Sequence, residues 1–233
     1  MKIGFQDRAL VWIYVCIISL FLLIPLLGNY AVNVFSENIT MNNTVIIDAG
    51  HGGVDGGAVS CTGAYESQIN LEIAKRLNDL MHLMGVRTIM IRDTDRSVYT
   101  EGNTIAAKKV SDIKQRLKIV NSITNALFVS IHQNNFSDAR YYGAQVFYNA
   151  KAGSKELAEQ LQTSFREALN TSNRRQIKQS SGVYLMEHIN CTGVLIECGF
   201  LSNQEEEAML RDSTYQKKLC CVMSATVSQY LNS

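Results

Sequence analysis

Two histidines follow apolar segments of this sequence in similar ways. His51 and His132 each come directly after a run of β-branched and apolar residues, and a third such run ends in Glu197. Glycines on both sides of His51 allow other groups to come close to its ring. Imidazole and carboxylate groups that gather at one place are the side chains from which metal-dependent hydrolases build their sites. The sequence therefore predicts a metal hydrolase site.

A catalytic zinc ion typically takes three protein ligands and keeps its fourth position for water. Glu66 is the best-placed third ligand beside His51 and His132, because the glycine-rich segment 52–63 joins it to His51 and can fold back. One zinc ion held by two imidazoles and one carboxylate lowers the pKa of its bound water to about 7 and polarises a carbonyl oxygen. Glu197 is predicted to take the proton of the water and pass it to a leaving amine.

Structural roles remain open for several of these residues. A histidine after a strand can be a turn residue, Glu66 can complement a helix dipole, and Glu197 can be a buried ion-pair partner. Asp48 is a candidate acceptor that would orient the ring of the first histidine. His82 and His188 are expected to have no role in the site.

The hydrophobic pattern predicts that strands and helices alternate along the chain. Strands are predicted at 45–48, 86–91, 127–132, 143–148, 183–186 and 194–198, and helices at 66–84, 113–123, 155–169 and from a capping box at 202–205 to the end of the chain. Segment 143–148 is expected at an edge of the sheet, and 93–111 as an irregular loop with one helical turn. This alternation indicates an α/β fold, a single three-layer α/β/α domain around a mostly parallel sheet. Parallel strands would bring His51 and His132 to one edge.

The N-terminal segment differs in composition from the rest of the chain. No charged residue occurs from Ala9 to Gly28, roughly the length that a bilayer requires, and Lys2 and Arg8 precede it. Residues 1–30 are predicted to be a signal peptide or a signal-anchor transmembrane segment, followed by a linker at 31–44 and a catalytic domain at 45–233. The protein is therefore expected to be exported and either secreted or membrane-anchored.

The overall composition excludes other classes. The chain has 233 residues and a formal net charge of +1, so nothing indicates a nucleic-acid partner. A single proline argues against low-complexity tracts. Six cysteines in an exported protein invite a disulfide framework, but a chain of this length can fold without one, and unpaired thiols are expected.

A set of short motifs covers nearly everything after Thr44. They are Ile47–Gly53, the helix that begins at Glu66, Arg92–Asp95, Arg116 with Asn121, Phe128–His132 and Ile196–Asn203. In this order they resemble the zinc-dependent N-acetylmuramoyl-L-alanine amidases of the amidase-3 family, which hydrolyse bacterial cell walls. Gln133 departs from the family pattern, which usually has a small residue there, and is expected to alter the wall of the cleft.

The resemblance implies one Zn²⁺ held by His51, Glu66 and His132, with Glu197 as the catalytic carboxylate. It implies a six-stranded sheet flanked by helices. The reaction that it implies is hydrolysis of the amide between the lactoyl group of N-acetylmuramic acid and L-alanine of the stem peptide. The implied partners are the glycan strand and the stem peptide of peptidoglycan.

The absence of two features indicates which members of the family the sequence resembles most. The sequence contains no cell-wall-binding repeat, and the stretch between Tyr148 and Ser181 is too short for an inserted regulatory helix. An anchored, single-domain member resembles the germination-specific (CwlD-type) amidases of spore-forming bacteria. This implies a role in muramic-δ-lactam formation in the spore cortex and in germination, at the forespore membrane. Because no element of the sequence targets or restrains the enzyme, an accessory activator protein is expected.

Two other classes of protein stay open. A hydrolase with Cys198 as nucleophile and His132 or His188 as base would leave Glu66 and the glycine-rich loop without a role. A non-catalytic, membrane-tethered wall-binding protein would not need Glu197.

Overall fold

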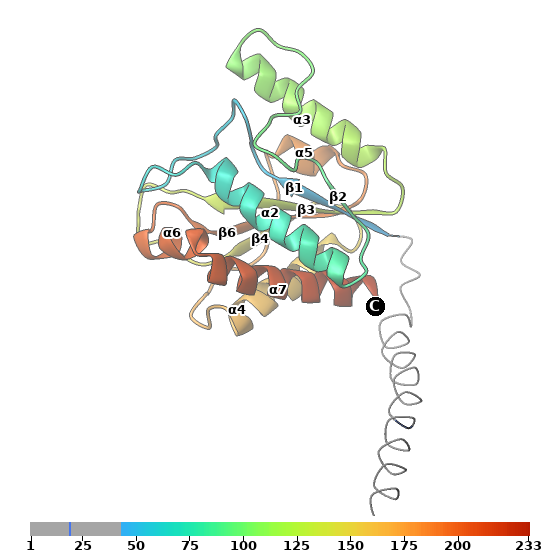
Figure 1. Ribbon diagram of the computed structural model, residues 1–233, viewed down its shortest axis with the longest axis vertical. Helices are drawn as coiled ribbons and strands as arrows, with labels where there is room; N and C mark the ends of the chain where they lie inside the picture. The colour runs from blue at the N-terminus through green and yellow to red at the C-terminus, as the bar shows by residue number, and fades with distance from the viewer. Residues whose placement is uncertain (1–18, 20–42) are drawn as a thin grey trace, which may run out of the picture. The chain divides into compact units, whose positions relative to one another are not determined.

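The computed structural model describes Ser19 and residues 43–233 of the chain (Figure 1). The predicted signal or anchor segment at 1–30 and nearly all of the predicted linker at 31–44 lie outside the described residues, apart from Ser19 and residues 43 and 44. Within the described part, no helix has both the length and the apolar character needed to cross a membrane.

Six strands form one sheet in the order β2-β1-β3-β6-β4-β5. They are β1 (Thr44–Ala49), β2 (Thr88–Met90), β3 (Ala126–Asn134), β4 (Gln145–Tyr148), β5 (Lys178–Gln179) and β6 (Thr192–Phe200). Strands β2, β1, β3 and β6 run parallel to one another, whereas β4 is antiparallel to β6 and parallel to β5. The predicted six-stranded, mostly parallel sheet is confirmed.

Helices cover both faces of the sheet. They are α2 (Glu66–Leu83), α3 (Ile105–Asn121), α4 (Ser154–Ala168), α5 (Tyr184–His188), α6 (Gln204–Arg211) and α7 (Ser213–Leu231). Helices α2, α4 and α7 pack on one face, with α2 and α7 side by side, and α3 and α5 lie on the other (Figure 1). The predicted three-layer α/β/α architecture is therefore confirmed.

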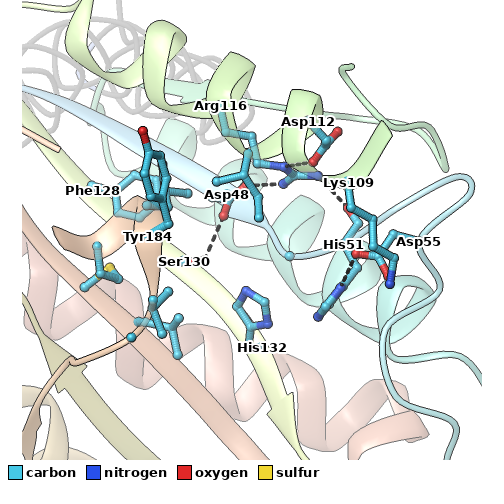
Figure 2. Close-up of a pocket in the computed structure, with 17 residues that line it drawn as sticks. Asp48, His51, Asp55, Lys109, Asp112, Arg116, Phe128, Ser130, His132 and Tyr184 are labelled. Atoms are coloured by element: carbon cyan, nitrogen blue, oxygen red, sulfur yellow. Dashed lines mark hydrogen bonds and ion pairs between the residues drawn. The ribbon is translucent and has the colours of Figure 1, made fainter. Parts of the chain in front are cut away.

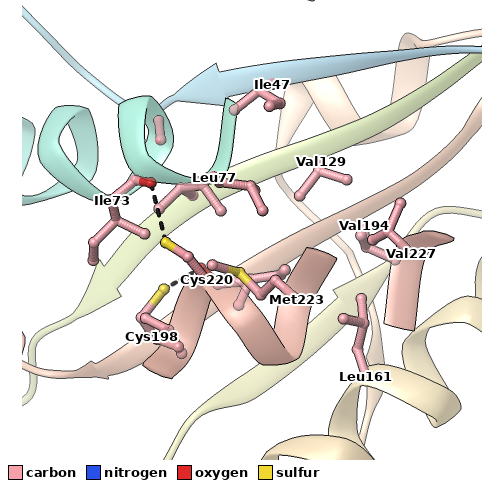
Figure 3. Close-up of a cluster of buried hydrophobic side chains, with 14 of the residues drawn as sticks. Ile47, Ile73, Leu77, Val129, Leu161, Val194, Cys198, Cys220, Met223 and Val227 are labelled. Atoms are coloured by element: carbon pink, nitrogen blue, oxygen red, sulfur yellow. Dashed lines mark hydrogen bonds between the residues drawn. The ribbon is translucent and has the colours of Figure 1, made fainter. Parts of the chain in front are cut away.

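The two faces of the sheet differ in their apolar cores. Because side chains alternate along a strand, Ile47 and Val129 pack with the larger core under α2, α4 and α7 (Figure 3). Their neighbours Ile46 and Phe128 pack with a smaller core under α3 and α5. Towards the carboxyl ends of the strands, the positions on this second face become polar, and they form the floor of the candidate site.

The predicted helix boundaries are wrong for α3. This helix begins at Ile105, eight residues before the predicted start, and the side chain of Thr104 caps it by accepting a hydrogen bond from the backbone N–H of Ala107. Ile105 and Val110 are 62% and 54% exposed, so the first half of the helix lacks a buried apolar stripe. That is why the hydrophobic pattern did not reveal it.

Three further predictions about local structure are wrong. Residues 183–186, predicted as a strand, belong mostly to α5, which is too short to show a helical period. Strand β4 is not at the edge, because the two-residue strand β5 pairs with it there. The predicted C-terminal helix is two helices, capped by Asn203 and Asp212, and Asn203 rather than Ser202 accepts the first N–H groups.

Candidate metal centre

His51 stands in the turn directly after β1. Its φ of 59° lies in the left-handed region, which non-glycine residues rarely adopt. Its Nδ1 is 2.8 Å from a carboxylate oxygen of Asp55, and the other oxygen of Asp55 is 2.7 Å from Nζ of Lys109 (Figure 2). Asp55 therefore orients the His51 ring, and backbone strain at this turn is typical of a functional position.

Asp48 does not orient His51, so that prediction is wrong. Its buried carboxylate accepts hydrogen bonds from Arg116 and Ser130 instead (Figure 2). Burial raises the pKa of Asp48, but the charges of Arg116 and His132, together with the hydrogen bonds from Ser130 and Arg116, leave this pKa below its ordinary value. Arg116 also donates to the carbonyl oxygens of Ala49 and His51. The Asp48–Arg116 pair thus supports the backbone that carries His51.

Glu66 joins the two histidines. One of its carboxylate oxygens is 3.0 Å from Nδ1 of His132, and the other is 3.3 Å from Nε2 of His51. The centroids of the two imidazole rings are 5.0 Å apart. One possible ligand atom from each of the three residues lies within 4.8 Å of the other two. The structure therefore brings together the three predicted ligands in a group that can hold a metal ion.

The charges around this group favour a cation. Burial lowers the pKa of His51, but hydrogen bonds to Glu66 and Asp55 and their charges raise it to about 9. Burial raises the pKa of Glu66, but the two histidines lower it far below its ordinary range. The two carboxylates thus stabilise a positive charge at this position, either on an imidazole or as a bound metal ion.

Two glycines leave room for the ligands. A methyl group at Gly50 would overlap the His132 ring. One at Gly57 would lie 2.7 Å from an oxygen of Glu66 and 2.8 Å from Cδ2 of His51. Glycine is therefore required at both positions for close approach, and at Gly57 also for a backbone φ of 70°.

Glu197 lies opposite His132 in the β3–β6 register. Its Oε2 is buried and has no hydrogen-bond partner among the described residues, which also contain no ion pair to Glu197. Burial raises the pKa of Glu197 to about 7, although the charge of His132 lowers it. A buried carboxylate without a partner is costly. The structure therefore disfavours the alternative of a structural ion pair and leaves this oxygen available to a molecule bound at the site.

A cavity of about 320 Å³ opens beside the two histidines. Residues of β3 and β6 form its floor, and α3 and the segment around α5 form its walls; among them are Ser130, His132, Leu195, Ile113, Val183 and Met186. Sequence reasoning missed this second wall, because it predicted a strand at 183–186. It also missed Asp55 and Lys109, although a carboxylate four residues after His51 in the same loop was a usable signal.

Other candidate residues lie away from the centre. Cys198 is 1% exposed, on the α2/α7 face of β6, and burial raises the pKa of its thiol, which argues against a cysteine nucleophile (Figure 3). Gln133 is buried on the same face and donates to Asn70, so the prediction that it alters the cleft wall is wrong. His82 and His188 are exposed and lie outside the metal-binding group.

Comparisons with known proteins agree with this fold. Residues 45–228 match the family model of N-acetylmuramoyl-L-alanine amidases (Amidase_3). The chain belongs to this family.

Among its relatives is the germination-specific N-acetylmuramoyl-L-alanine amidase of Bacillus subtilis (strain 168), 35% identical over 80% of this chain and 78% of that protein. The structure of the CwlD amidase from Clostridioides difficile in complex with the GerS lipoprotein matches with a TM-score of 0.79 and 39% identity, over 82% of this chain and 99% of that one. An N-acetylmuramoyl-L-alanine amidase from Clostridium difficile 630 matches with a TM-score of 0.72 and 31% identity, over 83% and 99%.

Proposed function

We propose that this protein is a zinc-dependent amidase that hydrolyses the bond between the lactoyl group of N-acetylmuramic acid and L-alanine of the peptidoglycan stem peptide. The observation that carries the proposal is the convergence of His51, Glu66 and His132 from three separate segments, with Glu197 on the neighbouring strand. Membership of the amidase family supports the same reaction.

The proposed ligands of one Zn²⁺ are His51, Glu66 and His132. Imidazole nitrogen and carboxylate oxygen are donors that zinc prefers, and two histidines with one glutamate form a known type of catalytic zinc site. The small size of the group, the clearance at Gly50 and the negative charge around His51 support this assignment. The chemistry that the ion supplies when bound is activation of a water molecule and polarisation of the amide carbonyl. Asp55 acts as a positioning residue by holding the His51 ring.

Glu197 is proposed to move the proton of the reaction. As the water oxygen bonds to the carbonyl carbon, one water proton passes to Glu197. Glu197 then gives this proton to the alanine nitrogen as the C–N bond breaks, and the other water proton is lost when the new lactoyl carboxylic acid ionises. The pKa of about 7 that burial confers on Glu197 suits a group that must both accept and donate near neutral pH.

We assign residues 45–233 as the catalytic domain, preceded by a signal or anchor segment at 1–30 and a linker at 31–44. The uncharged run from Ala9 to Gly28 and the match of the family model from residue 45 support this division. The proposed place of action is outside the cytoplasm, at the forespore membrane, where the cut precedes muramic-δ-lactam formation in the cortex. The likeness to a germination-specific amidase and to CwlD supports this role.

An accessory activator protein is part of the proposal. It is supported by a relative of known structure, the C. difficile CwlD amidase, which is in complex with the GerS lipoprotein. Zinc occupancy and hydrolysis are measured with and without an extract of the native compartment. We expect both to rise with the extract, and full activity of the isolated protein would count against an activator.

The decisive experiment is mass analysis of the products from purified peptidoglycan. The zinc-loaded protein should release intact stem peptides with a free alanine amino group. A chelator should abolish the reaction, zinc should restore it, and alkylation of thiols should leave it unchanged. In His132→Ala we expect loss of both bound zinc and turnover, whereas the exposed His188→Ala should keep both. Cleavage at any other bond, or turnover by metal-free protein, would contradict the proposal.

A further inference from the structure

A second pocket lies between the β3–β4 loop and the segment that precedes β5. It has a volume of about 320 Å³ and is lined by Arg140, Tyr141 and Tyr142 of the β3–β4 loop and by Arg174 and Arg175 before β5. We call it the arginine–tyrosine pocket. Both tyrosines are exposed, at 46% and 44%. Nothing in the proposed hydrolytic step uses these residues.

The arginine–tyrosine pocket carries an excess of positive charge. Arg140 pairs with Asp138 at 2.7 Å, but among the described residues neither Arg174 nor Arg175 forms an ion pair. Glu206 acts on Arg175 through its charge, yet its carboxylate accepts hydrogen bonds from backbone N–H groups, those of Gly143 and Phe200. Two guanidinium groups therefore remain without a carboxylate partner.

Arg175 is held in a fixed orientation. Its Nε donates to the carbonyl of Tyr142 at 2.7 Å, and its Nη1 donates to Oε1 of Gln145 at 3.1 Å. Its guanidinium also lies 4.2 Å from the centre of the Phe200 ring. A guanidinium has five N–H donors, so further donors remain for a ligand. A planar, pre-oriented fork of this kind suits a carboxylate.

A row of polar side chains connects this pocket to the hydrolytic centre. Glu197 pairs with His132 on one side and with Gln145 on the other. Residues paired in this way point to the same face of a sheet. The row therefore runs from His132 through Glu197 and Gln145 to Arg175. Two strand spacings separate β3 from β4, on the order of 10 Å, which an extended peptide covers in about three residues.

The position of Glu197 sets the direction of the substrate. If Glu197 gives its proton to the alanine nitrogen, the leaving peptide must lie on its side of the centre. The arginine–tyrosine pocket is on that side, since Arg175 contacts Gln145 of β4, the neighbour of Glu197, whereas the floor of the cavity comes from β1, β3 and Leu195 of β6. Resting on the proposed function, we propose that the arginine–tyrosine pocket binds a stem-peptide carboxylate, two or three residues beyond L-alanine, through Arg174 and Arg175.

The test uses the full-length, zinc-loaded protein and two muropeptides that differ only in their stem-peptide carboxylates, free in one and converted to carboxamides in the other. The wild type should show a KM about tenfold higher for the amidated substrate, since a charge-assisted contact is lost. Arg174→Gln should raise KM for the free acid by about the same factor, leave kcat unchanged, and not affect the amidated substrate.

Two controls make the result specific. Arg87→Gln removes the same charge from an exposed residue just before β2 and should behave as the wild type. Arg175→Lys should raise KM for the free acid less than Arg174→Gln, because it keeps the charge but loses the planar fork. If hydrolysis proceeds normally but the wild type does not distinguish the two substrates, or Arg174→Gln affects both equally, the assignment of the pocket is wrong.

A binding measurement separates this inference from the proposed function. Calorimetric titration with the isolated stem peptide should show weaker binding to Arg174→Gln than to the wild type, whether or not the protein turns over. Equal binding would overturn the inference alone. Failure of the wild type to cleave either muropeptide, with this difference in binding intact, would overturn the proposed reaction alone.

Discussion

The two faces of the sheet use alternate residues of the same strands in opposite ways. On the α2/α4/α7 face, Val129 and Ile131 of β3 are fully buried among apolar side chains. On the α3/α5 face, the intervening Ser130 and His132 line a cavity, and Glu197 of β6 holds a buried, unpaired oxygen. One face is packed for stability, and the other keeps groups that burial disfavours. Stability from the first face compensates for the strain and desolvation on the second.

The difference arises from the helices that cover each face. Helices α2 and α7 have 18 and 19 residues and cover the first face along the strands. On the second face α3 has 17 residues, but its first half lacks a buried apolar stripe, and α5 has only 5 residues. The smaller cover leaves space at the carboxyl ends of the strands, where a substrate can reach the candidate centre.

The largest effect on turnover is expected from a substitution on the α3/α5 face. Glu197→Gln removes the proposed proton carrier and should lower turnover by about 10²–10⁴-fold with zinc binding retained. Turnover of defined muropeptides and the zinc content of the purified protein measure the two effects. Glu167→Gln, on the exposed side of α4, is the matched control and should change neither. Intact turnover in Glu197→Gln would refute the mechanism.

The same substitution should make the metal-free protein more stable at neutral pH. Because the folded-state pKa of Glu197 is about 7, against an ordinary 4.5, the folded state holds this proton more tightly than the unfolded chain. The contribution of Glu197 to the stability of the wild type therefore falls as pH rises from 4.5 through 7. The advantage of Glu197→Gln in chemical denaturation should be present above pH 7 and shrink towards pH 4.5. A constant difference across this range would contradict the assigned pKa.

A substitution on the α2/α4/α7 face should change stability and leave catalysis unchanged. Leu77→Ala, in the core under α2, should lower the free energy of unfolding by about 2–5 kcal/mol, because it leaves a cavity among fully buried side chains. Where the variant is still folded, its kcat should equal that of the wild type. Leu83→Ala on the same helix, 79% exposed, is the control and should change the free energy of unfolding little. A large fall in kcat of folded Leu77→Ala would show that the two faces are not independent.

The smallest effect on zinc binding is expected from Asp55, which reaches the proposed ion only through a ligand, His51. Asp55→Asn weakens the acceptor that holds the His51 ring, and zinc affinity should fall about 10–100-fold. Competition with a chelator of known affinity measures this change. The free energy of unfolding of the metal-free protein should fall by no more than about 1 kcal/mol, since the ion pair that Asp55 forms with the exposed Lys109 is also lost. Asp79→Asn, exposed on α2, serves as the control. Unchanged zinc affinity in Asp55→Asn would remove Asp55 from the metal centre.

Periodicity and residue type were enough to predict the central framework from the chain alone. Strands β1, β3 and β6 and helix α2 have apolar patterns that are long enough to define their faces. Since parallel strands end at a common edge, the meeting of His51 and His132 followed from the same patterns. The short elements α5 and β5 span too few residues to carry such a pattern.

Contacts between distant segments determine which side chains become partners, and the sequence patterns did not predict these contacts. Because side chains alternate along a strand, Asp48 lies on the face of Ser130 and Arg116. The loop after His51 folds back, so that Asp55 contacts the His51 ring. The arginine–tyrosine pocket likewise joins a loop after β3 to a segment about 30 residues later, which pack together through Arg175. Local sequence specifies which face a side chain takes along a strand, but its partner across the fold depends on how loops close, and only the folded chain determines that.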